Sequence, residues 1–184
     1  MLLGRLAIMR GMYDPASFSV VEQLRNGRQI EIRALKPGDR QELLAAADRT
    51  SDRSLYRRFF GVRREFTEEE VAAFVNIDFL NEVALIAMVH ESGREVIAGG
   101  GRYIVVRPGT AELAFTVVDE YQGQGIGSAL LRHLVTLARA AGLRELIAEV
   151  LPDNAAMLQV FERSGLELRR QRESGVVHLT LQLG

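Results

Sequence analysis

Hydrophobic and polar positions along this chain follow two periods, and together they predict a mixed α/β fold. Residues 29–35 alternate polar and apolar side chains, which is typical of a half-buried strand. Residues 126–141 instead repeat apolar side chains every three or four positions, which is typical of an amphipathic helix. The two patterns occur in one chain without a dividing linker, so we expect one domain in which helices flank a mixed sheet.

Capping and turn residues bound the remaining elements. Asp39 with Glu42, and Thr67 with Glu70, have the spacing of a capping box, which predicts a helix start at each place. Ser92-Gly93 and Ser174-Gly175 predict turns between strands. The predicted elements are strand 29–35, helices 39–47, 51–60 and 67–75, strands 83–89, 96–106 and 111–118, helix 126–141, strand 146–151, helix 154–164, and strands 166–172 and 176–183.

Two stretches depart from these regular patterns. Gly99, Gly100 and Gly101 interrupt an apolar strand, which predicts a bulge or a close approach of backbones. Residues 1–27 have weak periodicity, and we expect an N-terminal extension that either forms a short docking helix around 17–24 or is partly mobile. The domain proper is then expected to span residues 28–184.

Composition narrows the function classes. The 184 residues include no cysteine, which excludes disulfides, thiolate metal sites and a cysteine nucleophile. The net charge of -1 supplies no field that attracts nucleic acid or an anionic membrane. No apolar stretch approaches the ~20 residues of a membrane-spanning helix, and no signal peptide is evident. We therefore expect a cytoplasmic protein without a nucleic-acid or membrane partner, and with a homodimer as a possible assembly.

The segment 119–128 carries the most informative pattern. A strand, a glycine-dense turn and a helix start together favour binding of a diphosphate, because the first N–H groups of a helix are unpaired and lie at its positive end. A P-loop would need a lysine after Gly127, but Ser128 and Ala129 follow. The spacing of the glycines also does not match the dinucleotide fingerprint. A plain connection between strand and helix remains the alternative.

Gln122-x-x-Gly125-x-Gly127 matches the acyl-CoA-binding signature of the GNAT superfamily of N-acetyltransferases. The segment from Asn154 to Phe161, followed by Gly165, is similar to the second motif of that family. This resemblance runs from about residue 29 to the C-terminus. It implies the GNAT fold, which is a mostly antiparallel sheet with two splayed parallel strands, and it implies acetyl-CoA as the acyl donor.

Upstream, the segments 54–60, 67–75, 77–78 and 82–85 resemble the catalytic domain of bacterial protein lysine acetyltransferases of the Pat type. Several of those proteins carry a fused cyclic-nucleotide-binding or CoA-ligase-like domain. We expect this chain to be a stand-alone or truncated version, so regulation by a cyclic nucleotide is not assumed for it.

Acetyl transfer needs a neutral amine, and keeping a lysine neutral at pH 7 costs about 4.6 kcal/mol. A positioned base is therefore useful. Glu112 is the best candidate, because it lies in an otherwise apolar strand that leads into the glycine turn, and the resemblance implies a carboxylate base in this strand. A solvent-facing glutamate without a role is the alternative. Glu149 is a second carboxylate within reach.

The resemblance also implies the residues that bind acetyl-CoA. A backbone N–H of Val117 or Val118 would donate to the thioester oxygen, backbone amides of the turn would hold the pyrophosphate, and Asn154 would bind the pantetheine arm unless it only caps a helix. The expected binding residues are Val117, Val118, Gln122, Gly123, Gln124, Gly125, Ile126, Gly127, Ser128, Asn154 and Phe161.

Phe161 departs from the family pattern, because many members carry a tyrosine there that is thought to protonate the leaving thiolate. Phenylalanine has no proton to donate, so we expect it only to pack against CoA. Tyr56, Tyr103 and Tyr121 are weak substitutes. A coenzyme thiol with a pKa of about 8.5 also leaves without an acid.

Two further groups complete the search for chemistry. His90, His133 and His178 lie in different elements, so no metal site is predicted. The cluster of Arg53, Arg57, Arg58, Arg63 and Arg64 favours an acidic protein surface or a phosphate of CoA, or else pairs with the glutamates at 65 and 68–70.

The sequence thus predicts an acetyl-CoA-dependent N-acetyltransferase that acts by direct transfer in a ternary complex, with a protein lysine as the favoured acceptor. A small-molecule amine is the alternative acceptor. A regulatory module that binds acyl-CoA without turnover is the alternative from another class.

Overall fold

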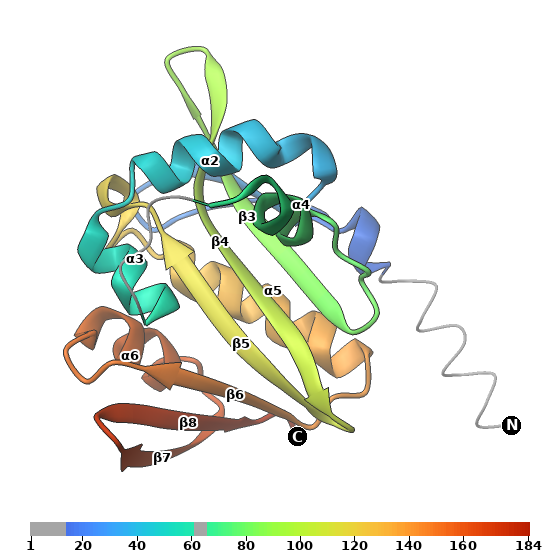
Figure 1. The fold of residues 1–184 in the computed structure, drawn as a ribbon, viewed down its shortest axis with the longest axis vertical. Helices are drawn as coiled ribbons and strands as arrows, with labels where there is room; N and C mark the ends of the chain where they lie inside the picture. Colours follow the sequence, from blue (N-terminus) through green and yellow to red (C-terminus); the bar gives the residue numbers. More distant parts are fainter. Residues whose placement is uncertain (1–13, 61–65) are drawn as a thin grey trace, which may run out of the picture.

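The computed structural model describes residues 14–60 and 66–184 and contains one eight-stranded sheet (Figure 1). The strand order across the sheet is β1-β2-β3-β4-β5-β6-β8-β7. Every neighbouring pair is antiparallel except β5 and β6, which run parallel. The strands are β1 Ser19–Gln23, β2 Gln29–Ala34, β3 Glu82–Glu91, β4 Arg94–Arg107, β5 Thr110–Val117, β6 Glu145–Val150, β7 Glu167–Glu173 and β8 Val176–Gln182.

Helices cover both faces of the sheet. Figure 1 shows α2, α3 and α4 in front of it and α5 behind it, with α6 beside β6. The helices are α2 Arg40–Asp48, α3 Asp52–Phe59, α4 Glu68–Val75, α5 Ile126–Ala140 and α6 Ala155–Glu162, and the short 3-10 turns are η1 Pro15–Ser17, η2 Pro37–Asp39 and η3 Asp119–Tyr121. Within the described part of the chain, no helix is long and apolar enough to cross a membrane.

The parallel strands β5 and β6 pair over only three residues. Thr110, Ala111 and Glu112 lie opposite residues 145–147, and beyond Glu112 the two strands diverge (Figure 1). This arrangement confirms the predicted fold class, a mostly antiparallel mixed sheet with two splayed parallel strands and flanking helices.

The glycines of β4 make the close approach that the sequence predicts. The pairing of β3 with β4 shifts by one residue next to Gly99, which is a bulge. A Cβ on Gly99 would lie 2.9 Å from the carbonyl oxygen of Thr116, and one on Gly101 would lie 2.5 Å from the ring of Phe115. These glycines therefore let β5 and the ring of Phe115 pack closely against β4.

The prediction of a short helix around residues 17–24 is wrong. Residues Ser19–Gln23 form β1, which pairs with β2 through contacts such as Val20 opposite Ile32. The overlooked signal is Asn26-Gly27 between two alternating segments, since this dipeptide favours a hairpin turn and Gly27 adopts a φ of 83°. β1 is the edge strand of the sheet, and the division of the chain at residue 28 stays a prediction.

The first predicted capping box is also wrong in its detail. The helix begins where expected, but the Asp39 carboxylate makes no capping hydrogen bond to α2. It accepts instead from the backbone N–H of Lys36 at 2.7 Å and pairs with the Arg33 guanidinium at 2.7 Å. The second box is confirmed, because Thr67 and Glu70 cap α4 reciprocally.

Candidate active site

A groove of about 970 Å³ opens where β5 and β6 diverge. Residues from both strands, from the turn before α5 and from α6 line it. All but one of the site residues expected from the sequence contribute to its wall. They are Glu112, Val117, the turn residues 122–128, Asn154 and Phe161, with Val118 the exception.

The turn at 122–127 presents backbone N–H groups to this groove. Gly125 precedes α5 with a φ of 97°, a left-handed conformation that favours glycine. The N–H groups of Ile126, Gly127 and Ser128 open the helix and have no acceptor within it. No acidic residue lies in the first turn of α5. The turn therefore fits a diphosphate, since negative charge is favoured at such a helix start.

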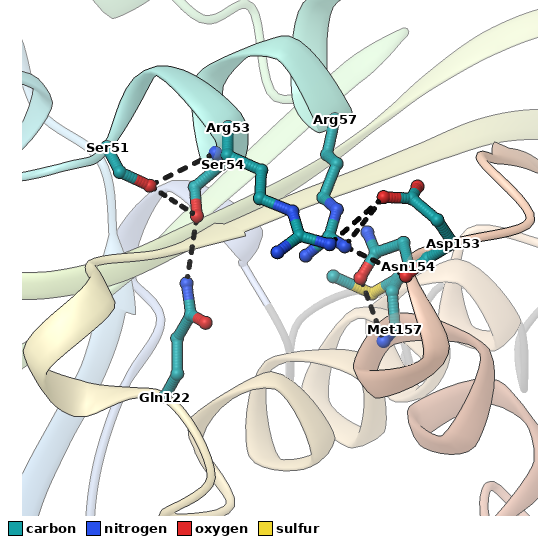
Figure 2. Close-up of polar contacts among 8 residues, drawn as sticks. All are labelled: Ser51, Arg53, Ser54, Arg57, Gln122, Asp153, Asn154 and Met157. Carbon is teal, nitrogen blue, oxygen red and sulfur yellow. Dashed lines mark hydrogen bonds and ion pairs between the residues drawn. The ribbon is translucent and has the colours of Figure 1, made fainter.

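Gln122 has a different role from its neighbours in the turn. Its backbone N–H already donates to the carbonyl oxygen of Asp119 at 3.2 Å. Gln122 still lines the groove, and its expected amide contact with the pyrophosphate stays a prediction. Its side-chain Nε2 donates to Ser54 Oγ at 3.1 Å (Figure 2). The same Nε2 donates to the Val117 carbonyl oxygen at 3.0 Å. Gln122 thus joins the end of β5 to helix α3.

Val117 and Val118 end β5, and their backbone groups point in opposite directions. The N–H of Val118 donates to the carbonyl oxygen of Ala98 on β4 at 2.9 Å, and its side chain is only 2% exposed. Successive N–H groups of a strand point to alternate edges, so that of Val117 points to the edge that β6 has left. Val117 therefore has the orientation of an oxyanion donor, whereas the N–H of Val118 is already bonded and its side chain does not line the groove. The assignment of both residues to the binding of acetyl-CoA stays a prediction.

Glu112 is an exposed carboxylate at the point where the two strands part. Arg58 of α3 also lines the groove and interacts electrostatically with Glu112. Burial and the neighbouring Arg102 lower the pKa of Arg58 to about 10, while Glu112 acts in the opposite direction. Arg102 itself pairs with Glu82 and with the carbonyl oxygen of Phe74. Glu112 thus faces a cationic charge across the groove.

The second carboxylate, Glu149, lies on β6 and is exposed on the same groove. Its Oε1 lies 3.3 Å from Nδ1 of His178 on β8. Glu149 is therefore paired with a residue of a neighbouring strand, whereas Glu112 makes no ion pair among residues 14–60 and 66–184.

Asn154 and Phe161 lie at the two ends of α6. Asn154 Oδ1 accepts from the backbone N–H of Met157 at 3.3 Å, so the side chain does cap the helix (Figure 2). This leaves Nδ2 as its donor toward the groove. Phe161 is 1% exposed and packs on Phe115 with ring centroids 5.9 Å apart.

The tyrosines suggested as substitute acids are poorly suited to that role. Burial raises the pKa of Tyr103 to about 12, and its side chain is absent from the groove wall. Tyr121 is buried, and its hydroxyl donates to Glu91 Oε2 at 2.6 Å. Tyr56 is exposed on α3.

Helix α3 bridges the two splayed strands. On the β5 side Ser54 accepts from Gln122, and on the β6 side Arg57 donates to the Asp153 carboxylate at 2.9 Å and to its carbonyl oxygen at 2.8 Å (Figure 2). Arg53 reaches the same carboxylate at 3.3 Å. The hydrogen bond from Arg57 lowers the pKa of Asp153. The sequence did not suggest this bridge, because its partners lie about 100 residues apart.

The bridge also resolves part of the arginine cluster. Arg53 and Arg57 pair with Asp153 rather than with the glutamates at 68–70, and Arg58 lies inside the groove. Arg63, Arg64 and Glu65 lie outside the described residues.

The β1–β2 turn is the other part of the site that sequence reasoning missed. Asn26 Nδ2 donates to Gln124 Oε1 at 3.1 Å, and the Arg28 guanidinium lies 5.2 Å from the ring centre of Tyr121. Arg25 of this turn and Arg132 of α5 also line the groove. Arg132 is paired with Glu22 of β1, which lies on the same wall. Arg25 adds positive charge to the groove that the amide turn lines, where a phosphate is favoured.

Comparison with known proteins gives a consistent family. A family model described as "Acetyltransferase (GNAT) family" matches residues 46–166. The chain is 34% identical over 138 residues to Acetyltransferase PA5475 of Pseudomonas aeruginosa, covering 74% of each protein. It is 34% identical over 159 residues to Acetyltransferase Pat of Mycolicibacterium smegmatis, covering 84% of this chain and 46% of that protein.

A solved structure agrees with these relatives. The crystal structure of the GNAT domain of S. lividans PAT is similar with a TM-score of 0.80 and 33% identity, over 89% of this chain and 96% of that one.

Proposed function

This chain belongs to the GNAT family of acetyltransferases and resembles the catalytic domain of Pat-type enzymes, and from that premise we propose that it acetylates protein lysines directly, with Glu112 as the general base. One observation carries the proposal. A carboxylate at the parting of β5 and β6 and an N–H of Val117 directed into the gap lie five residues apart on one strand. The amide turn that fits a diphosphate follows directly.

Acetyl-CoA, the donor used by this family, supplies the acyl group as an activated thioester. The N–H groups of Ile126 and Gly127 bind its diphosphate at the start of α5. Asn154 donates through Nδ2 to the pantetheine arm, and Phe161 contributes apolar wall.

Glu112 then accepts the proton of the incoming amine, directly or through water. The positive charge of Arg58 disfavours a protonated amine in the groove beside it. The Val117 N–H donates to the thioester oxygen as negative charge develops there. This division of roles needs donor and acceptor together in the groove, which is a ternary complex.

A thiol-release assay with acetyl-CoA tests the proposal, using a lysine-containing peptide library and, separately, a panel of small amines. We expect release with the peptides, and a loss of about 10²–10⁴-fold in kcat for Glu112→Gln with CoA affinity retained. Glu149→Gln is the matched control and should stay near wild-type activity.

Three outcomes contradict parts of the proposal. If Glu112→Gln turns over as fast as the wild type, Glu112 is not the general base. If thiol is released only with small amines, the acceptor is a small amine and not a protein lysine. If the protein binds CoA tightly but releases no thiol with any acceptor, it is a module that binds acyl-CoA without turnover.

A further inference from the structure

A second, smaller cavity lies between the sheet and helices α2, α3 and α4. Its volume is about 120 Å³, and its lining is almost entirely apolar. Small side chains leave this space open, because Ala47 of α2, Ala114 of β5 and Gly100 of β4 line it. Dry apolar cavities of ~150 Å³ hold a benzene-sized molecule, so this one has room for roughly four or five carbons.

The cavity adjoins the groove at β5. Ala114 and Thr116 line both spaces. Side chains at every second position of a strand share a face, so these two follow Glu112 along the face that α2, α3 and α4 cover. Thr116 also precedes Val117, whose N–H points into the gap. The opening of the cavity therefore lies beside the place proposed for the thioester carbon.

The charged groups around the cavity do not make it a polar site. Glu70 accepts from the backbone N–H of Thr67, and Arg102 pairs with Glu82. Arg58 lines both the cavity and the groove, and the aliphatic part of such a side chain packs against apolar groups. The interior offers mainly hydrocarbon contact.

We propose that this cavity receives the tail of an acyl group longer than acetyl, so that the enzyme uses short-chain acyl-CoA donors of about four to six carbons. This inference rests on the proposed function, because it requires a thioester beside Val117. A tail that continues from the thioester carbon past Thr116 and Ala114 enters the cavity without crossing the groove where the amine arrives.

Calorimetric titration of the full chain with CoA, acetyl-CoA, butyryl-CoA, hexanoyl-CoA and octanoyl-CoA tests this without an acceptor. We expect butyryl-CoA to bind about tenfold tighter than acetyl-CoA, because two more methylenes are buried. The gain should end by octanoyl-CoA, whose tail exceeds the cavity. Equal affinity for acetyl-CoA and butyryl-CoA overturns the inference while leaving the proposed function intact. Absence of CoA binding overturns both.

Two variants fill the cavity from opposite walls. A Cβ on Gly100 meets only ordinary contacts, 3.4 Å from the Leu85 carbonyl oxygen and 3.7 Å from Ile86, so Gly100→Val extends into the space without displacing backbone. Ala47→Leu fills it from α2, and Ala45→Leu on the exposed side of the same helix is the matched control.

Both filling variants should abolish the tenfold preference for butyryl-CoA while binding CoA as the wild type does. Ala45→Leu should keep the preference. If the preference persists in Ala47→Leu, the tail does not enter the cavity and the inference fails.

Discussion

The two ends of strand β5 differ in how they pair with the neighbouring strand β6. At its start, Thr110–Glu112 pair with β6, and the Thr110 hydroxyl and Arg107 contact Glu145. At its end, Val117 has no strand partner on the β6 side, and its carbonyl oxygen accepts from the side chain of Gln122. One end is a closed sheet, and the other is an open edge with backbone groups available to a ligand.

This difference shows that a binding site can form where two paired strands diverge and leave backbone groups unpaired. An unpaired backbone N–H inside a protein is costly unless a ligand or water takes it. At the closed end the backbone groups form hydrogen bonds that stabilise the sheet. At the open end one N–H is directed into a groove. Helix α3 holds the open end in place through Gln122 on one side and Asp153 on the other.

The largest effect should follow from removing the N–H of Val117. Replacing Val117 by its α-hydroxy analogue makes a backbone ester and keeps the side chain. We expect kcat to fall by about 10²–10³-fold, as for loss of one oxyanion donor, with the thermal midpoint little changed. The same ester at Val118 removes its bond to Ala98 and should cost about 1 kcal/mol of stability without that loss of kcat. Equal effects at both positions would contradict the comparison.

Two glycines with positive φ provide the next test. Gly125 lies at the open end with a φ of 97°, and Gly109 lies at the closed end with a φ of 79°. Alanine at either position should cost about 1–2 kcal/mol of unfolding free energy, because the left-handed conformation is strained. Only Gly125→Ala should also weaken CoA binding, by about tenfold, since we propose that its turn contacts the diphosphate. Calorimetry and thermal melts measure both quantities, and a similar loss of affinity in Gly109→Ala would argue against the assigned turn.

Substitution of two carboxylates with lowered pKa values distinguishes an effect on stability from an effect on binding. The hydrogen bond from Arg57 lowers the pKa of Asp153 at the open end, and that from Gln182 lowers the pKa of Glu145 at the closed end. A lowered pKa contributes stability above the ordinary value of about 4, and this contribution is lost as pH falls through the lower, folded value.

Asp153→Asn and Glu145→Gln should therefore both lower the thermal midpoint at pH 7, and their difference from wild type should shrink on acidification below about pH 4. Only Asp153→Asn should raise the KM for acetyl-CoA, by about threefold, because it weakens the bridge from α3. A KM that is unchanged at pH 7 would show that the bridge is not needed for binding.

The smallest effect is expected for Phe161→Tyr. The coenzyme thiol has a pKa of about 8.5 and leaves without an acid, so kcat should change by less than about threefold. The buried position makes a melt of this variant a necessary control, since a hydroxyl without a partner is costly there. An increase of tenfold or more in kcat would show that an acid was missing from the wild-type reaction.

Much of the fold could be predicted because local patterns agree with tertiary packing. The alternation at residues 29–35 and the helical repeat of α5 each report burial on one face, and the capping box of α4 marks the start of a helix. Each of these elements formed as expected. The error at residues 17–24 came from reading an edge strand by its weak periodicity. Only one face of β1 packs on the protein, and Val21 on the other face is 57% exposed. The Asn26-Gly27 turn was the better signal there.

The sequence by itself determined the family, the glycine turn and Glu112 as the candidate base, because these depend on residue types at short spacing. Tertiary structure alone decided that the N–H of Val117 is free and that of Val118 is bonded, since strand pairing sets which edge each amide faces. The tertiary structure also placed Arg57 beside Asp153 and formed the cavity that Gly100 lines. Contacts between residues about 100 positions apart leave no periodic trace in a sequence, because they depend on how whole elements pack.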